Sequence, residues 1–188
     1  MATVNVTPET FELVNFDAGE IQKLASELAD TIGLSDDVTI DIEVDEAMMM
    51  GRVSSRLEER RIVVEAFGGA FEDQRKSRAF SAERTRTALA HGFMRARDRL
   101  DPAFGDAPPD DEVSIPLESA WATHIEGRLE RLGLPIRRQR RIYHFRVRHG
   151  FNDSADAVFE ELWSSDSLNW DDLNRLSVAA EETRAAVS

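Results

Sequence analysis

The sequence predicts an α+β protein in which one helix packs on a small sheet and a mainly helical half follows. Apolar residues recur at intervals of three and four early in the chain, then alternate with polar residues, and return to helical spacing in the second half. Of the 188 residues, 41% are hydrophobic and 31% are charged. That balance is typical of globular proteins.

The first half combines a helix with a sheet of three or four mostly antiparallel strands. Residues 17–32 form the helix, which has an acidic capping box at its start, a glycine after its end and an apolar stripe of Ile21, Leu24, Ala25, Leu28, Ala29 and Ile32. Residues 38–45 alternate strictly, as a half-buried strand does. We expect further strands at 52–57 and 61–67, and a short one at 10–14.

The second half contains five predicted helices. They span residues 81–100, 116–132, 135–148 and 153–163, and a last one begins at Asn169. The segment 135–148 also alternates as a strand would, with Tyr143, Phe145 and Val147 on one side. We favour the helix because proline lies in its first turn, arginines lie in its last turn and a glycine follows.

We expect one globular domain over residues 1–178 with two lobes. Residues 1–73 hold the helix and the sheet, residues 79–178 hold the helices, and the alanine-rich end 179–188 is predicted to fray. There is no cysteine, which excludes disulfides and thiolate metal sites. Apolar runs are too short for a membrane span and the start lacks a secretory pattern. We therefore expect a cytoplasmic protein with no membrane partner.

Six arginines and no carboxylate lie between Pro135 and His149, in a chain of formal net charge −13. On a helix, four basic residues form one ridge about 16 Å long, at i, i+4, i+7 and i+11. The ridge consists of Arg137, Arg141, His144 and Arg148, and Arg140 belongs to the same tract. Arginine forks pair with carboxylates and phosphates, so the tract must meet acidic groups.

Three kinds of acidic group could pair with the arginine tract. The first is the protein's own carboxylates, either the row Asp41, Glu43 and Asp45 on one strand face or the acidic loop 110–112. The second is a partner protein, which includes a second copy of this chain in a homodimer. The third is phosphate or nucleic acid, which the acidic excess disfavours because most of the surface would repel it.

The residues that usually carry catalysis do not form a known pattern. None of the four histidines begins a His-Glu-x-x-His motif, and same-face residues such as Asp41 and Glu43 stand about 6.8 Å apart on a strand, too far to chelate readily. Glycine-rich phosphate loops and Gly-x-Ser-x-Gly elbows are missing from the sequence. We expect no metal, no cofactor and no catalysis, with a hydrolase built from distant residues as an alternative.

The order strand, helix, strands and long helix resembles the arrangement of zincin metallopeptidases. The resemblance implies two histidines and a glutamate on the long helix, where this chain has Ala90-His91-Gly92-Phe93-Met94. A degenerate, metal-free relative would retain only a binding role.

The sequence thus predicts a non-catalytic protein-interaction module that uses the arginine-rich helix and the acidic sheet face. The alternatives are a binder of phosphate ligands or nucleic acid through the same tract, and a hydrolase or degenerate metallopeptidase-like protein.

Overall fold

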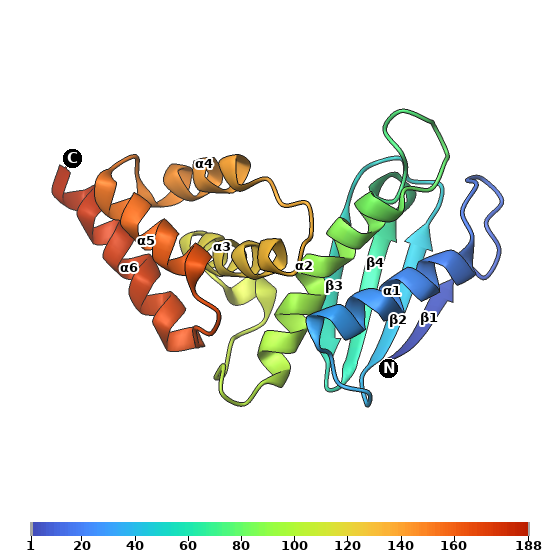
Figure 1. Ribbon diagram of the computed structural model, residues 1–188, viewed down its shortest axis with the longest axis horizontal. Coiled ribbons are helices and arrows are strands. Elements are labelled where there is room, and N and C mark those ends of the chain that lie inside the picture. The colour runs from blue at the N-terminus through green and yellow to red at the C-terminus, as the bar shows by residue number, and fades with distance from the viewer. Residues whose placement is uncertain (1, 188) are drawn as a thin grey trace. The chain divides into compact units, whose positions relative to one another are not determined.

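The computed structural model describes residues 2–187, with side chains described as far as Glu181. The chain forms two compact units, Met1–Leu100 and Asp101–Ser188 (Figure 1). The α+β class is as predicted. The boundary between the units follows Leu100, whereas the sequence placed the junction of the two lobes between residues 73 and 79. The long helix that precedes this boundary packs on the first helix and on the sheet.

Unit 1 is a four-stranded mixed sheet with two helices on one face (Figure 1). The strand order is β1-β2-β4-β3. Its elements are β1 (Thr3–Thr7), α1 (Ala18–Ile32), β2 (Thr39–Asp45), β3 (Val53–Glu58), β4 (Arg61–Phe67), a short 3-10 helix (Gly68–Ala70) and α2 (Ala82–Leu100). Strands β1 and β4 both pair with β2 in parallel, and only β3 pairs antiparallel, with β4.

Two predictions about this sheet were wrong. The first strand is β1 at Thr3–Thr7 rather than 10–14, and two of the three strand pairs are parallel rather than antiparallel. The connection from β1 to β2 runs through α1, and a helical crossover returns the chain parallel to its start. Residues 10–14 lie beyond this strand, where the Glu46 carboxylate accepts hydrogen bonds from the backbone N–H groups of Glu12 and Leu13 at 2.9 and 2.6 Å.

The core of unit 1 follows the periodicities of the sequence. Alternate residues of β2 and β4 face the helices, and the apolar stripe of α1 covers them; the buried set includes Ile21, Leu24, Leu28, Ile40, Ile42, Ile62 and Val64. Each such side chain contributes about 1.5–3 kcal/mol on burial. Helix α2 approaches β3 closely because Gly92 has no side chain, and a Cβ there would lie 2.3 Å from the Ser55 hydroxyl.

Unit 2 is helical, and α3 (Ile115–Arg131) packs against each of the other three helices. These are α4 (Arg138–His149), α5 (Asp153–Ser164) and α6 (Trp170–Val187), with a short 3-10 helix at Asp110–Glu112 before α3. The helical interpretation of 135–148 is confirmed, with the first turn beginning at Arg138. The five helices expected after α1 are all present.

Aromatic residues fill the core of unit 2. Trp121 of α3 is fully buried and stacks on Phe104 at 5.5 Å between ring centroids, while Trp170 meets it edge-on at 5.4 Å. The predicted fraying of 179–188 stays a prediction: α6 runs to Val187, and Ser188 and the side chains from Glu182 on lie outside the described residues. Among residues 2–187, no helix is both long enough and apolar enough to cross a bilayer.

Candidate interaction surface

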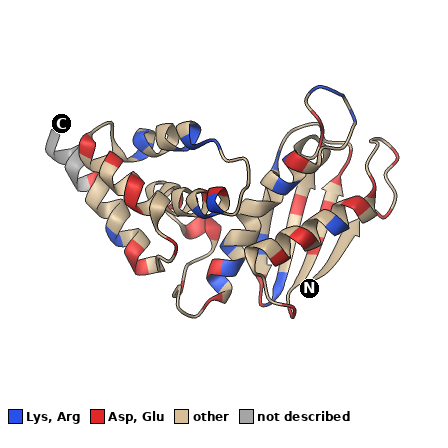
Figure 2. Cartoon of the chain, in the orientation of Figure 1, with Lys and Arg blue, Asp and Glu red and all other residues tan. Residues whose placement is uncertain are grey.

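The arginine tract of α4 meets carboxylates on the two helices beside it, α3 and α5. Arg141 pairs with Glu126 of α3, and Arg146 and Arg138 pair with Asp156 and Glu160 of α5. Basic residues gather on α4 in Figure 2, whereas α5 carries only acidic charges. The tract therefore holds α4 against α3 and α5 through these three guanidinium–carboxylate pairs.

The pair between Arg141 and Glu126 is the most buried of the three. The two side chains are only 19% and 17% exposed. The Nε atom of Arg141 is also buried and has no hydrogen-bond acceptor. A charge in such a place depends on its partner, because neither group is fully solvated.

The pair between Arg146 and Asp156 has the forked geometry that favours arginine. Nε and Nη2 donate to the two carboxylate oxygens at 2.7 and 2.6 Å. The hydrogen bonds from Arg146 lower the pKa of the Asp156 carboxyl, and the same bonds raise the pKa of the guanidinium. Arg138 adds a pair with Glu160 at 2.5 Å and lies over the rings of Phe159 and Trp163.

Two members of the carboxylate row singled out in the sequence, Asp41 and Asp45, have partners within unit 1. Asp41 accepts hydrogen bonds from Asn5 and Arg61, which lower the pKa of its carboxyl, with Asn5 as the larger cause. Glu43 is exposed, and Asp45 accepts a hydrogen bond from the backbone of Ala47 at 3.1 Å. Among the described residues, the carboxylates that pair with the tract include Glu126, Asp156 and Glu160. The sequence did not single them out, because nothing local shows which helices border α4.

The outer face of the sheet carries charges of both signs. Arg56 pairs with Glu58 and Glu65, and Arg61 pairs with Asp41 and lies 3.7 Å from Glu58. Guanidinium groups thus neutralise much of the face that the sequence predicted to be acidic.

The side of α4 that faces solvent combines basic and apolar residues. Its apolar members are Tyr143 and Val147 of the helix, which are 58% and 40% exposed, and Phe151, which follows the end of the helix and is 67% exposed. Its basic members, also exposed, are Arg137, Arg140, His144 and Arg148. We call these seven residues the outward face of α4.

The outward face differs from the predicted ridge at one position. Arg137, His144 and Arg148 lie on it as expected, but Arg141 turns toward α3 and Arg140 takes its place. Arg140 Nε lies 3.4 Å from His144 Nε2, and the Tyr143 ring meets Phe151 edge-on at 6.1 Å. The remaining histidine of the tract, His149, is buried between the Phe145 carbonyl and Ser177.

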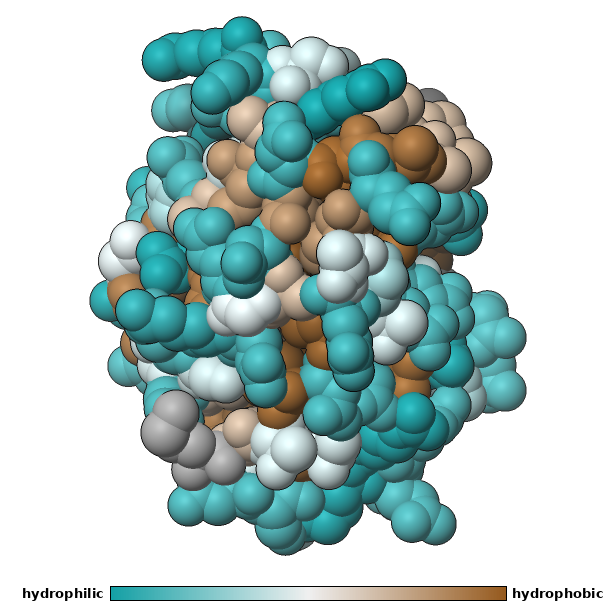
Figure 3. Space-filling view, turned by 90° about the vertical axis from the view of Figure 1, so that its right-hand side faces the viewer, coloured by the Kyte–Doolittle hydropathy of each residue, from teal (hydrophilic) through white to brown (hydrophobic). Residues whose placement is uncertain are grey.

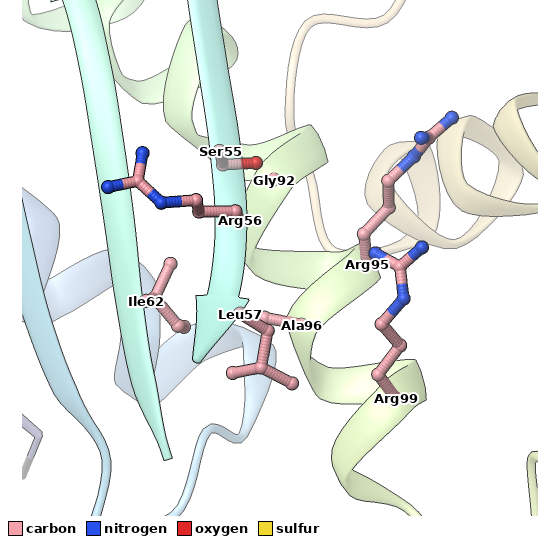
Figure 4. A pocket seen from close by; sticks show the side chains of 8 residues that line it. All are labelled: Ser55, Arg56, Leu57, Ile62, Gly92, Arg95, Ala96 and Arg99. Carbon is pink, nitrogen blue, oxygen red and sulfur yellow. The ribbon is translucent and has the colours of Figure 1, made fainter. Parts of the chain in front are cut away.

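Two places in unit 1 are weaker candidates. A small recess lies between β3 and α2, lined by Ser55, Arg56, Leu57, Ile62, Gly92, Arg95, Ala96 and Arg99. In Figure 4 the guanidinium of Arg56 points away from those of Arg95 and Arg99, so the three do not converge on one ligand. Leu13, Met49 and Met50 are exposed elsewhere in this unit. On the side shown in Figure 3, apolar side chains alternate with hydrophilic ones.

Within the described residues, no three His, Asp or Glu side chains are grouped to hold a metal ion. Helix α2 carries His91, Gly92 and Arg95 in the stretch where a zincin would have its ligands, and the resemblance to zincins stays a prediction. Comparisons with protein families, curated proteins and solved structures find no match to this chain.

Proposed function

We propose that this protein is an interaction module that binds an acidic region of a partner protein through the outward face of α4. One observation carries the proposal: exposed aromatic rings and guanidinium groups lie together in the segment 135–151, which has no carboxylate of its own, in a chain of net charge −13. Tyrosine, phenylalanine and arginine are enriched at the cores of protein interfaces, and tyrosine and arginine are also enriched among hot spots.

The arginines of α4 and its N-cap fall into a paired group and an exposed group, which supports this proposal. Arg138, Arg141 and Arg146 fasten α4 to α3 and α5. Arg137 and Arg140 point to solvent instead, next to exposed apolar side chains. Exposed cations steer an acidic partner toward the face, and the buried apolar area then supplies affinity.

A protein partner is favoured over nucleic acid. A binder of phosphate backbones gains affinity from a basic surface, and here the acidic residues outnumber the basic ones by 36 to 23. The mixed charge of the outer sheet face also favours α4 over the sheet as the binding surface. The proposal therefore rests on α4 alone.

The test uses three fluorescent probes with the full chain. They are an acidic peptide that contains leucine and tryptophan, the same peptide with lysine in place of each acid, and a single-stranded oligonucleotide. We expect anisotropy to detect binding of the acidic peptide only, and the affinity to fall as salt increases. The Arg137→Ala/Arg140→Ala double variant should weaken it about tenfold, a typical loss for two interface arginines.

Arg175→Ala is the matched control, because Arg175 is an exposed arginine of α6 that pairs with Asp172 in its own helix. It should bind the acidic peptide as the wild type does. If the oligonucleotide bound more tightly than the acidic peptide, the function would be nucleic-acid binding. If Arg175→Ala lost as much affinity for the acidic peptide as the double variant, only the total charge of the protein would matter. Either result contradicts the proposal.

A further inference from the structure

Strand β1 lies at one edge of the sheet in unit 1. The strand order is β1-β2-β4-β3, so β1 pairs with β2 alone (Figure 1). The backbone N–H of Thr3 donates to the Val38 carbonyl at 3.1 Å, and the odd-numbered residues of β1 therefore direct their backbone groups to β2. Val4 and Val6 direct their backbone groups to the other side. Such an edge is a template for an added strand.

Most backbone groups along this edge are unpaired. The Val4 carbonyl accepts a hydrogen bond from Gln22 Nε2 at 2.7 Å. For the N–H of Val4 and for both backbone groups of Val6, the described residues supply no hydrogen-bond partner. The strand contains no charged residue and no proline, which are common means of keeping an edge from pairing. The edge of β1 is therefore able to accept another strand.

We infer that the occupant of this edge is β1 of a second copy of the chain, which lies antiparallel to the first. The strand has the sequence Thr-Val-Asn-Val-Thr, which reads the same in both directions. A two-fold axis at Asn5 therefore sets threonine opposite threonine and valine opposite valine. Self-complementarity of this kind is what a two-fold contact between identical subunits requires. Cross-strand pairs of threonine and of β-branched residues also stabilise sheets.

This register uses the free backbone groups as well as the side chains. It sets Val4 of one copy opposite Val6 of the other, and each of these pairs exchanges two hydrogen bonds. The Val4 carbonyl has two lone pairs and can keep its bond from Gln22. A register shifted by two residues would set Pro8 opposite Val4, and proline has no N–H to donate. The pairing centred on Asn5 is therefore the favoured one.

Charge and area also favour a second copy at this edge. Two chains of formal net charge −13 repel each other, so they associate best where no acidic residues oppose one another. Beside the uncharged strand, α1 presents Gln22, with Ala18 and Ser26 one turn away on the same side. Five-residue strands are too short to bury the roughly 1,200–2,000 Å² of a stable interface by themselves. The small side chains of Ala18 and Ser26 let the two copies of α1 approach and add to this area.

The first test measures the self-association of the full chain by sedimentation equilibrium over a wide range of protein concentration. We expect a monomer–dimer equilibrium that tightens as salt is added, because salt screens the repulsion between the two acidic chains. Binding of the acidic peptide to α4 has the opposite salt dependence. Hydrogen exchange followed by NMR should show that the Val6 amide exchanges more slowly as the dimer forms.

Two double variants test the register. Positions 3 and 7 oppose each other across the two-fold axis and do not exchange hydrogen bonds, so their side chains come close. Thr3→Lys/Thr7→Lys sets like charges opposite each other and should weaken the dimer at least about tenfold. Thr3→Glu/Thr7→Lys sets opposite charges there and should dimerise at least as tightly as the wild type.

The two double variants are matched controls for each other. Both threonines are exposed, so both variants should melt close to the wild type. The variant with two lysines also lowers the net negative charge, and general repulsion therefore does not explain a loss of dimer in it.

Three results would each overturn the inference. They are a wild type that stays monomeric at all concentrations, a dimer whose Val6 amide exchanges as fast as in the monomer, and equal dimerisation of the two double variants. None of these results bears on the proposed function, which is carried by α4 in unit 2.

Discussion

Arg146 and Asp156 join α4 to α5 through two side-by-side hydrogen bonds, Nε to Oδ1 at 2.7 Å and Nη2 to Oδ2 at 2.6 Å. Both side chains are about one-third exposed, at 34% each. Forked geometry makes this pair stronger than a simple surface contact, and solvent screening limits its contribution. The same helix thus carries paired arginines such as Arg146 on its inner side and exposed ones such as Arg137 and Arg140 on its outward face.

Replacing Asp156 with asparagine should lower the free energy of unfolding by about 0.5–1 kcal/mol at neutral pH. The folded pKa of Asp156 is lowered, so its contribution is complete above the unfolded pKa and is lost as pH falls through the folded pKa. Urea unfolding at several pH values checks this. The difference in the free energy of unfolding between the wild type and the variant should become smaller in acid. A difference that stays constant with pH would argue that the ion pair is not its source.

Arg141→Glu should destabilise unit 2 by at least about 2 kcal/mol, because it places a second carboxylate beside the largely buried Glu126. Thermal melting should show a midpoint several degrees below that of the wild type. Arg140→Glu makes the same change in charge one residue away, on the outward face, and should melt close to the wild type. Equal effects in the two variants would contradict the structural role of Arg141.

Gly127→Ala should separate α3 from α5. A Cβ at Gly127 would lie 2.2 Å from the carbonyl oxygen of Trp163, which is backbone and cannot rotate away. Overpacking of this kind costs about 1–3 kcal/mol, measurable by denaturant unfolding. The control is Gly51→Ala, where the added Cβ meets nothing closer than 3.8 Å, and a loss as large in this variant would refute the packing argument.

Asn5→Ala should raise the pKa of Asp41 toward its ordinary value. The Asn5 side chain donates a hydrogen bond of 2.6 Å to Asp41, and this bond is the larger cause of the lowered pKa. Carbon-detected NMR of the carboxyl group during a pH titration measures the change. Thr3→Ala, on the same strand but opposite Thr39, should leave the titration unchanged. An unaltered midpoint in Asn5→Ala would assign the effect to Arg61 instead.

Local signals predicted the elements whose ends are fixed by their own residues. Helix α1 begins where Asp17 accepts a hydrogen bond from the Glu20 backbone at 2.9 Å, and it ends at Gly33 with φ of 80°, as the capping pattern indicates. The helical form of α4 was predicted from proline, arginine and glycine; the arginines and Gly150 do mark its C-terminal end, whereas Pro135 precedes the N-cap, Arg137. Strand β1 was not predicted, because its alternation covers only Thr3 to Thr7 and its pairing with β2 depends on residues far along the chain.

The candidate surface was predictable in part. The sequence located the basic tract, and its helical periodicity placed Arg137, His144 and Arg148 on one side. It assigned Arg141 to that side as well, because periodicity gives the angle between side chains but not the direction of the neighbouring helices. Packing against α3 turned Arg141 inward to Glu126 and left Arg140 on the outward face.

The sequence by itself determined the α+β class, most of the helices and the concentration of arginine in one segment. Helix caps, apolar periodicity and charge depend only on residues close together in the chain. Only the tertiary structure decided that β1 and β4 run parallel to β2, and which carboxylates α4 meets. These features depend on contacts between residues far apart in the chain. Such contacts form only when several elements bury their apolar faces together.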